Sequence, residues 1–287
     1  MGCDNRIMCN VVEIKDKKWY AIINPEHGAD IEKLTFCKKD VYFPLKDESM
    51  IAENPFVHGS PILLPANRTS GGCFEVDGKT YSLPINDKKS ESNLHGLVYA
   101  QRFTVIDRQD SRICLEYRNF GNVYPFEFLL RIEYCICGDS FLQKYSITNT
   151  GHISMPYTFG LHTTFCEPKS FAAPIDAVYE RDEKFLPTGR ILALDKDKEC
   201  YRSGAKSYGN EITGYYRAAG TKSYIDDFEY EFSENFDTVT LYNGAGKSGF
   251  LCLEPQSGLV NGLNIPGGFR ILETGMTEVF YTRLSHM

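Results

Sequence analysis

Apolar and polar residues alternate over short segments of the sequence, and this pattern limits the possible folds more than any other feature. Residues 112–118, 126–134 and 238–242 each carry apolar side chains at nearly every second position. Because side chains of a strand point alternately to opposite faces, this period predicts half-buried β-strands. The 18 Tyr and 19 Phe residues also favour strands, and no segment has the pattern of a convincing long helix. The chain is therefore predicted to be all-β.

Turn signals separate these segments at short intervals. Residues 74–81 carry Asp77-Gly78 between β-prone flanks, the strongest short-range signal for a hairpin, and Gly138-Asp139 marks another turn. Short strands at this spacing predict a large, mainly antiparallel sandwich or barrel. No Pro/Ser linker or charge block divides the chain, so residues 1–287 are predicted to form a single domain, with residues 195–206 as a polar surface excursion.

Charge and hydropathy argue against several classes of partner. The net charge is −7, and the chain lacks the basic footprint of a nucleic-acid binder. No apolar run approaches the roughly 20 residues that cross a bilayer, and an anionic membrane would repel the chain. Residues 1–10 do not resemble a secretory signal, and Arg6 replaces the Ser or Thr of a myristoylation motif. The expected partner is a neutral small molecule, bound by a monomer or homodimer.

The ten cysteines favour a reducing compartment. They are scattered along a chain well above the size that needs disulfide staples, and none belongs to a CxxC pair, so a zinc site has weak support. We predict that they are buried, small apolar residues of a cytoplasmic protein.

The six histidines differ in their local sequence. Four lie in turns or at the C-terminus and are predicted to be exposed: His27, His58, His152 and His286. His95 precedes Gly96, which lets a backbone or a ligand approach closely. His162 lies in a strand-like run and shares a face with small residues, so that this face can line a cleft. Spacing alone favours hydrogen-bonded histidines inside a sandwich over histidines in a binding site.

Glu254 and Arg68 each follow an apolar segment. A carboxylate at Glu254, after residues 249–253, is costly to bury unless it is paired or functional, and burial raises its pKa toward the range of a general base. A strand end that emerges into water explains Glu254 equally well. Arg68 follows residues 63–67 and offers a fork of donors to sugar hydroxyls or a carboxylate, or else forms a structural ion pair.

Two adjacent acids, Asp226 and Asp227, interrupt another strand-like segment. Because side chains alternate along a strand, only one of them can face inward. The sequence contains no phosphate loop, no GxSxG and no HExxH. These absences argue against most nucleotide-dependent enzymes, serine hydrolases and zinc proteases.

Five short motifs follow one another along the chain. They are residues 59–68 ending in Asn67-Arg68, residues 93–96 with His95-Gly96, Gly160-Leu161-His162, residues 186–190 (LPTGR), and Leu253-Glu254-Pro255 followed by Asn261 and Asn264. In this order they resemble the motifs of the aldose 1-epimerase (galactose mutarotase-like) family, over residues 24–284. The resemblance implies the family's fold, a large antiparallel β-supersandwich, which agrees with the strand pattern.

The resemblance also implies an isomerase that interconverts the α and β anomers of a hexose. His162 would be the general acid that protonates the ring oxygen, and Glu254 the general base that removes the proton of the anomeric hydroxyl. The ring opens and closes on the other face without a metal or an organic cofactor. The residues implied to hold the sugar's hydroxyls are Arg68, His95, Asn67 and Asp226, with Asp227 second to Asp226.

Three departures from the family pattern leave the sugar open. The chain is shorter than the best-known galactose mutarotases, Asp226-Asp227 replaces Asp-His, and Gln256 replaces a frequent Trp. One alternative is a hexose-6-phosphate 1-epimerase, which needs clustered Arg or Lys residues at the cleft, with Arg68 and Arg102 as candidates. Others are a non-catalytic carbohydrate-binding or sensory module and a sandwich whose polar residues are structural.

Overall fold

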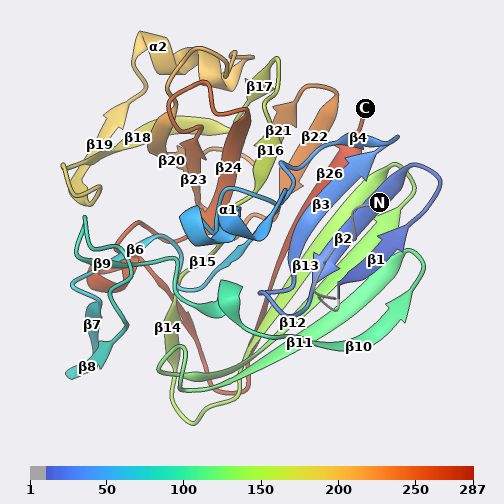
Figure 1. The fold of residues 1–287 in the computed structure, drawn as a ribbon. Helices are drawn as coiled ribbons and strands as arrows, with labels where there is room; N and C mark the ends of the chain where they lie inside the picture. Colours follow the sequence, from blue (N-terminus) through green and yellow to red (C-terminus); the bar gives the residue numbers. More distant parts are fainter. Residues whose placement is uncertain (1–10) are drawn as a thin grey trace.

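The computed structural model describes residues 11–287, of which strands are the main component (Figure 1). The protein is 51% strand and 7% helix, and its sheets are antiparallel. The all-β prediction is confirmed. The interpretations of residues 1–10 lie outside the described part of the chain.

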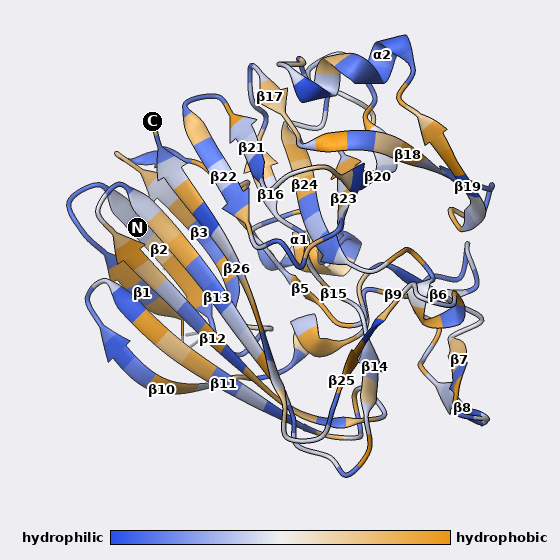
Figure 2. Cartoon of the chain, turned by 180° about the vertical axis from the view of Figure 1, so that it is seen from behind, coloured by the Kyte–Doolittle hydropathy of each residue, from blue (hydrophilic) through white to orange (hydrophobic). Residues whose placement is uncertain are grey.

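The first large sheet has eight strands in the order β10-β11-β12-β13-β26-β22-β21-β17. Their bounds are β10 Thr104–Gln109, β11 Arg112–Phe120, β12 Glu127–Cys137, β13 Ser140–Asn149, β26 Thr277–His286, β22 Phe228–Phe232, β21 Lys222–Ile225 and β17 Phe171–Ala172. Figure 2 shows blue and orange segments alternating along its long strands, because polar and apolar side chains face opposite sides.

The second large sheet also has eight strands and carries the residues of the site described below. Seven follow the order β19-β18-β20-β23-β24-β15-β5, and β16 pairs with β24 beside β15. Their bounds are β19 Pro187–Ala193, β18 Ile175–Arg181, β20 Thr213–Ala218, β23 Thr238–Tyr242, β24 Phe250–Ser257, β15 Phe159–Leu161, β5 Ile62–Leu63 and β16 Thr164–Cys166. All eight residues of β24 are buried, so its polar side chains lie in the interior.

Smaller sheets and short helices complete the described chain. A four-stranded sheet contains β1 Val12–Lys15, β2 Trp19–Asn24, β3 Asp30–Phe36 and β4 Lys39–Asp40. Three further sheets have two strands each. They are β6 Arg68–Ser70 with β9 Ser92–Leu94, β7 Cys73–Val76 with β8 Lys79–Ser82, and β14 Met155–Tyr157 with β25 Arg270–Leu272. The helices are α1 Glu48–Glu53, α2 Lys196–Glu199 and the 3₁₀ turns η1 Val98–Ala100, η2 Cys200–Arg202 and η3 Gly262–Asn264. Within residues 11–287, none of them has the length and apolar character to cross a membrane.

The local predictions from alternation and turns agree with these elements. The three alternating segments correspond to β11, β12 and β23. Asp77 and Gly78 connect β7 to β8 with φ angles of 52° and 72°, as a two-residue hairpin turn with two left-handed residues requires. The predicted excursion at residues 195–206 holds α2 and η2.

Aromatic side chains join the sheets into one large apolar core. Trp19 of β2 is 1% exposed, and its ring lies 6.1 Å from that of Phe141 on β13, so the four-stranded sheet packs on the first large sheet. Burying a side chain of this kind stabilises the fold by roughly 2 kcal/mol or more. Within residues 11–287 the prediction that the cysteines are buried holds for Cys114 and Cys252. Cys135 and Cys166 are half-buried, and the prediction is wrong at four positions, which are Cys37, Cys73, Cys137 and Cys200.

Candidate active site

Glu254 lies in the middle of β24 and is 2% exposed. The antiparallel register places it beside Thr240 of β23, and Thr240 beside Tyr215 of β20. Side chains at paired positions of neighbouring strands share one face of a sheet. These three residues therefore form a row across the second large sheet, with the carboxyl group at one end.

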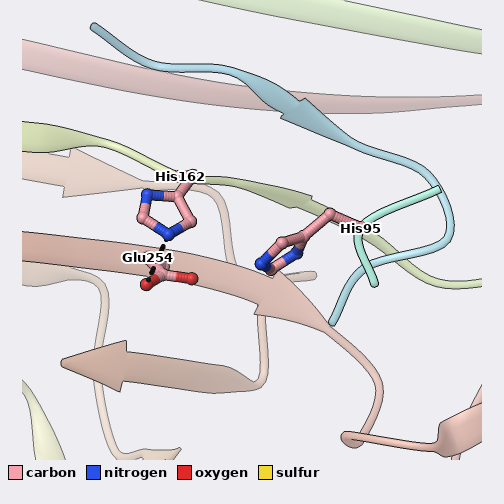
Figure 3. Close-up of side chains that lie close together, drawn as sticks. All are labelled: His95, His162 and Glu254. Atoms are coloured by element: carbon pink, nitrogen blue, oxygen red, sulfur yellow. Dashed lines mark ion pairs between the residues drawn. The ribbon is translucent and has the colours of Figure 1, made fainter. Parts of the chain in front are cut away.

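His162 lies directly opposite this carboxyl group. It connects β15 to β16, which both pair with β24, and Gly160 of β15 faces Gln256 while the residues of β16 face the other half of β24. Nε2 of His162 lies 3.3 Å from Oε1 of Glu254 (Figure 3). Gly160 permits this packing, because a Cβ there would lie 2.8 Å from the Gln256 side chain.

His95 forms a third side of the same group. Its backbone has a left-handed φ of 64°, and the next residue, Gly96, passes so close to the Leu64 carbonyl that a Cβ would lie 1.8 Å from the oxygen. The close backbone approach expected at this glycine is confirmed. The His95 ring lies edge-on to the His162 ring at 5.4 Å, and Phe56 contacts both rings at 4.6 and 5.8 Å. Figure 3 shows both imidazoles turned toward Glu254.

These three side chains also form the group best placed to hold a metal ion in the described part of the chain. Ligand atoms of His95, His162 and Glu254 lie within 4.8 Å of one another. Around tetrahedral zinc, nitrogen and oxygen ligands are separated by about 3.3 Å. His162 and Glu254 already lie 3.3 Å apart, so three-fold coordination would mainly require His95 to move closer to them.

Burial shifts both members of the pair toward their uncharged forms. Burial raises the pKa of Glu254 to about 8, although the Gln256 amide and the Arg68 charge act in the opposite direction. Burial lowers the pKa of His162 from its ordinary value, and it holds the pKa of His95 well below the ordinary histidine value. At a pH between the pKa of His162 and the pKa of Glu254, the pair therefore carries one exchangeable proton.

A pocket of about 410 Å³ opens onto this pair. Arg68 lines it and donates from Nη1 to the Tyr215 hydroxyl at 3.0 Å, while its Nη2 lies 3.2 Å from Oδ2 of Asp87. Asn67 is also part of the wall, with Nδ2 donating to Oε1 of Gln256 at 3.3 Å. The wall therefore combines guanidinium, amide, hydroxyl and imidazole groups.

Several polar atoms of pocket residues have no hydrogen-bond partner within residues 11–287. They are Nδ1 of His95, Nδ1 of His162 and Oγ1 of Thr240. A buried polar group without a partner is unfavourable, so these atoms lower the stability of the site.

Five of the six residues predicted for the site line this pocket, namely His162, Glu254, Arg68, His95 and Asn67. Asp226 does not, and its assignment to the sugar is corrected here. It occupies the tight turn between β21 and β22 with φ of 50°, and its Oδ1 accepts the backbone N–H groups of Lys169 and Ser170. Its neighbour Asp227 does not line the pocket either.

Other pocket residues were missed by the sequence reasoning. They are Phe56, Asp87, Arg181, Phe185 and Tyr215. A partial signal existed for two of them, since the LPTGR motif directly follows Phe185 and marks the β18–β19 hairpin that carries Arg181. Tyr215 belongs to an ordinary strand sequence, and only its pairing with β23 brings it to the site.

Comparison with known proteins gives a consistent family. The sequence profile described as aldose 1-epimerase matches residues 10–285. The uncharacterized protein YihR of Escherichia coli K12 is 28% identical over 172 residues, covering 56% of this chain and 54% of YihR. The protein LacX of Lactococcus lactis is 23% identical over 200 residues, covering 59% of this chain and 64% of LacX. The matches thus span less than two thirds of these curated relatives.

Solved structures extend the likeness over nearly the whole chain. A galactose mutarotase-like protein from Clostridium acetobutylicum has a TM-score of 0.88 at 21% identity, covering 96% of this chain and 95% of that one. Galactose 1-epimerase from Lactobacillus acidophilus has a TM-score of 0.79 at 15% identity, covering 96% and 94%. At these identities the likeness shows the fold, and it confirms the predicted supersandwich.

Proposed function

The chain belongs to the aldose 1-epimerase family, and we propose that it acts as a mutarotase, interconverting the α and β anomers of a hexose. The observation that carries this proposal is the buried pair of His162 and Glu254, 3.3 Å apart at a polar pocket of about 410 Å³. A histidine and a glutamate with shifted pKa values at one cleft are typical of an acid–base site.

Ring opening requires one proton at the ring oxygen and the removal of another from the anomeric hydroxyl. With His162 protonated and Glu254 ionised, His162 supplies the first proton and Glu254 takes the second. The open-chain aldehyde then faces neutral His162 and protonated Glu254. The pair still holds one proton, which is now on Glu254 and no longer on His162. After C1 rotates, reclosure returns the proton to His162 and releases the other anomer.

The surrounding residues favour the reactive arrangement of this proton. The positive charge of Arg68 lowers the pKa of Glu254 against the effect of burial, and so favours its ionised form. Arg68 is itself held by Asp87 and Tyr215. We propose that Arg68, Asn67 and His95 bind hydroxyls and hold the ring against the catalytic pair, which raises the rate by orientation.

A binding or sensory module is the alternative from another functional class. Sugar binding alone does not require a buried acid and base that share a proton, and burying Glu254 at 2% exposure is unfavourable for folding. The pair therefore favours catalysis over binding alone.

Exchange NMR between anomers tests the proposal on a panel of aldoses, with and without protein. We expect at least one sugar to show an exchange rate that rises in proportion to protein concentration. Binding without any exchange above buffer, for neutral and anionic sugars alike, would support the binding module and overturn the enzymatic proposal.

A further inference from the structure

A group of cations lies around one aromatic ring at the pocket. The guanidinium carbons of Arg68 and Arg181 each lie 4.9 Å from the centre of the Phe185 ring, and Nζ of Lys89 lies 5.2 Å from it. The three cations come from β6, from the end of β18 and from the segment before β9. This gathering is unexpected in a chain of net charge −7.

The Phe185 ring is held in place by an unusual turn. Phe185 has a left-handed φ of 62°, which is rare and costly for a bulky residue. Oδ1 of Asp182 accepts the backbone N–H groups of Lys184 and Leu186, both at 2.9 Å, and this closes the turn. Such strain is characteristic of functional sites, and here it places an aromatic surface beneath the cations.

The cations are only partly neutralised. Asp87 pairs with Arg68, whereas Arg181 donates to Oγ1 of Thr213 at 3.1 Å and has no carboxylate within 4 Å among the described residues. Two other acids line the pocket, Glu254 of the catalytic pair and Glu53, which is three residues from Phe56 on the histidine side. Two guanidinium groups on one ring repel each other, and a bound anion relieves that repulsion.

The sheet places Arg181 at the far end of the row that begins at Glu254. Thr240 and Tyr215 continue the row from β24 through β23 to β20, and Tyr179 of β18 pairs with Tyr215. Arg181 is two residues beyond Tyr179, and its guanidinium lies on the same face, since it donates to Thr213 at 3.1 Å and lies 5.6 Å from the centre of the Tyr215 ring. Its strand is three spacings of about 4.8 Å from β24, so Arg181 reaches the pocket from the side remote from the strand of the catalytic carboxyl group.

We propose that Arg181 binds an anionic substituent on the hexose, at the end of the ring away from the anomeric carbon, and that the nearby positive charges of Arg68 and Lys89 strengthen this binding. The inference rests on the proposed function, since it names the class of sugar that the catalytic pair acts on. Phosphate, sulfonate and carboxylate groups share the chemistry that is recognised, because their oxygens accept paired hydrogen bonds from a guanidinium fork.

This placement corrects the cation candidates named from the sequence. Arg68 does belong to the cluster, but Arg102 does not line the pocket. Its side chain is 73% exposed, and its Nε lies 3.2 Å from a carboxylate oxygen of Glu26. Arg181 takes the place that was expected for Arg102.

Anomer-exchange rates on matched sugars test the proposal. Glucose, glucose 6-phosphate and glucuronate are compared by exchange NMR, with wild type, Arg181→Gln and the control Arg190→Gln. Arg190 lies on the same hairpin and pairs with Glu180 outside the pocket, so its substitution removes the same charge. The readout is the ratio of kcat/KM for each anionic sugar to that for glucose.

We expect at least one anionic sugar to exceed glucose in kcat/KM by about tenfold, the effect of one charge-assisted hydrogen bond. Arg181→Gln lowers that ratio by about tenfold, and Arg190→Gln leaves it unchanged. Two results overturn the anion site while leaving the mutarotase proposal intact. In one, kcat/KM for glucose equals that for both anionic sugars. In the other, Arg181→Gln lowers kcat/KM equally for all three sugars.

A binding measurement separates failure of this inference from failure of the proposed function. Calorimetry follows glucose 6-phosphate and glucuronate binding to Glu254→Gln, with and without Arg181→Gln. If no sugar is exchanged but Arg181→Gln still weakens anion binding by about tenfold, the anion site stands and the mutarotase proposal falls. If Arg181→Gln leaves the affinity for both anions unchanged, the anion site is overturned.

Discussion

Residues 11–287 contain two buried pairs of a histidine and a carboxylate, and the two pairs differ in their surroundings. In one, Nε2 of His58 lies 3.0 Å from Oδ2 of Asp30, with side-chain exposures of 1% and 2%. In the other, His162 lies 3.3 Å from Glu254, with exposures of 7% and 2%. Only the second pair lines the pocket. Residue type, distance and burial are thus nearly the same, and the surroundings decide the role.

The partners of each carboxyl group explain the difference. Asp30 also accepts the backbone N–H of Ser60 at 2.9 Å. Burial lowers the pKa of His58, but the hydrogen bond and charge of Asp30 outweigh it, so the pKa of His58 is raised above its ordinary value. At Glu254 burial dominates and raises the pKa to about 8. The first pair stabilises a core, whereas the second keeps a proton ready for transfer.

The largest expected difference between the pairs is in catalysis. His162→Asn and Glu254→Gln should each lower kcat for anomer exchange by about 10²- to 10⁴-fold, because each removes one of the two proton-transfer groups. His58→Asn should keep most of the activity of the folded protein. Exchange NMR gives the rates, and circular dichroism confirms that the variants are folded.

The assignment fails if His58→Asn and His162→Asn lose activity equally. It also fails if Glu254→Gln retains wild-type exchange of the best substrate.

Stability should show the opposite order. Asp30→Ala should lower the free energy of unfolding by about 3–5 kcal/mol, because it leaves His58 buried without its partner. Glu254→Gln should leave stability unchanged or raise it. The folded state keeps the Glu254 proton to a higher pH than the unfolded state, so this carboxyl group destabilises the fold as pH rises from its ordinary pKa toward about 8.

Urea unfolding at pH 5 and pH 8 measures both effects. Glu254→Gln should gain stability relative to wild type between these two values. A loss of stability that grows with pH would show that Glu254 is ionised in the folded protein.

The pH profile of exchange should reflect the catalytic pair alone. As pH rises above about 8, Glu254 loses its proton while His162 is already neutral, so the pair has no proton to give. We expect kcat/KM to fall about tenfold per pH unit above that value. Burial lowers the pKa of His162, which places the acid limb well below the ordinary histidine range.

Spontaneous exchange in buffer is subtracted at each pH. If the acid limb of the profile lies at an ordinary histidine pKa, the burial of His162 is contradicted. A solvent-exposed histidine would then carry the reaction.

The smallest expected effect is at Asp226. Asp226→Asn should change KM by less than about twofold, because the side chain caps a turn outside the pocket and affects stability only modestly. Initial rates over a range of sugar concentrations give KM. A rise in KM of tenfold or more would return Asp226 to the sugar site.

Local sequence patterns predicted most of the fold. Alternation located β11, β12 and β23, and the Asp77-Gly78 signal located a hairpin, because these features depend on near neighbours. Burial of polar residues depends on contacts between distant segments. His58 was predicted to be exposed because its neighbours form a turn, but β3 brings Asp30 to it, so that prediction is wrong.

The sequence also predicted some residues of the site and missed others. Parity and motifs found His162 and Glu254, but Arg181 and Phe185 join Arg68 only through the packing of a distant hairpin. Asp226 was misplaced because two adjacent acids resemble an interrupted strand, whereas Asp226 forms the tight turn itself. Asp adopts a left-handed φ more often than most residues, but without a following glycine, as at Asp77-Gly78, the sequence did not mark Asp226 as a tight turn.

Anomer exchange of the best substrate, measured side by side for wild type, Glu254→Gln and His58→Asn at equal concentrations of folded protein, tests the central claim most directly. Glu254→Gln should fall to nearly the buffer rate while His58→Asn stays within about threefold of wild type. Wild-type exchange by Glu254→Gln would show that the carboxyl group facing His162 takes no part in the chemistry.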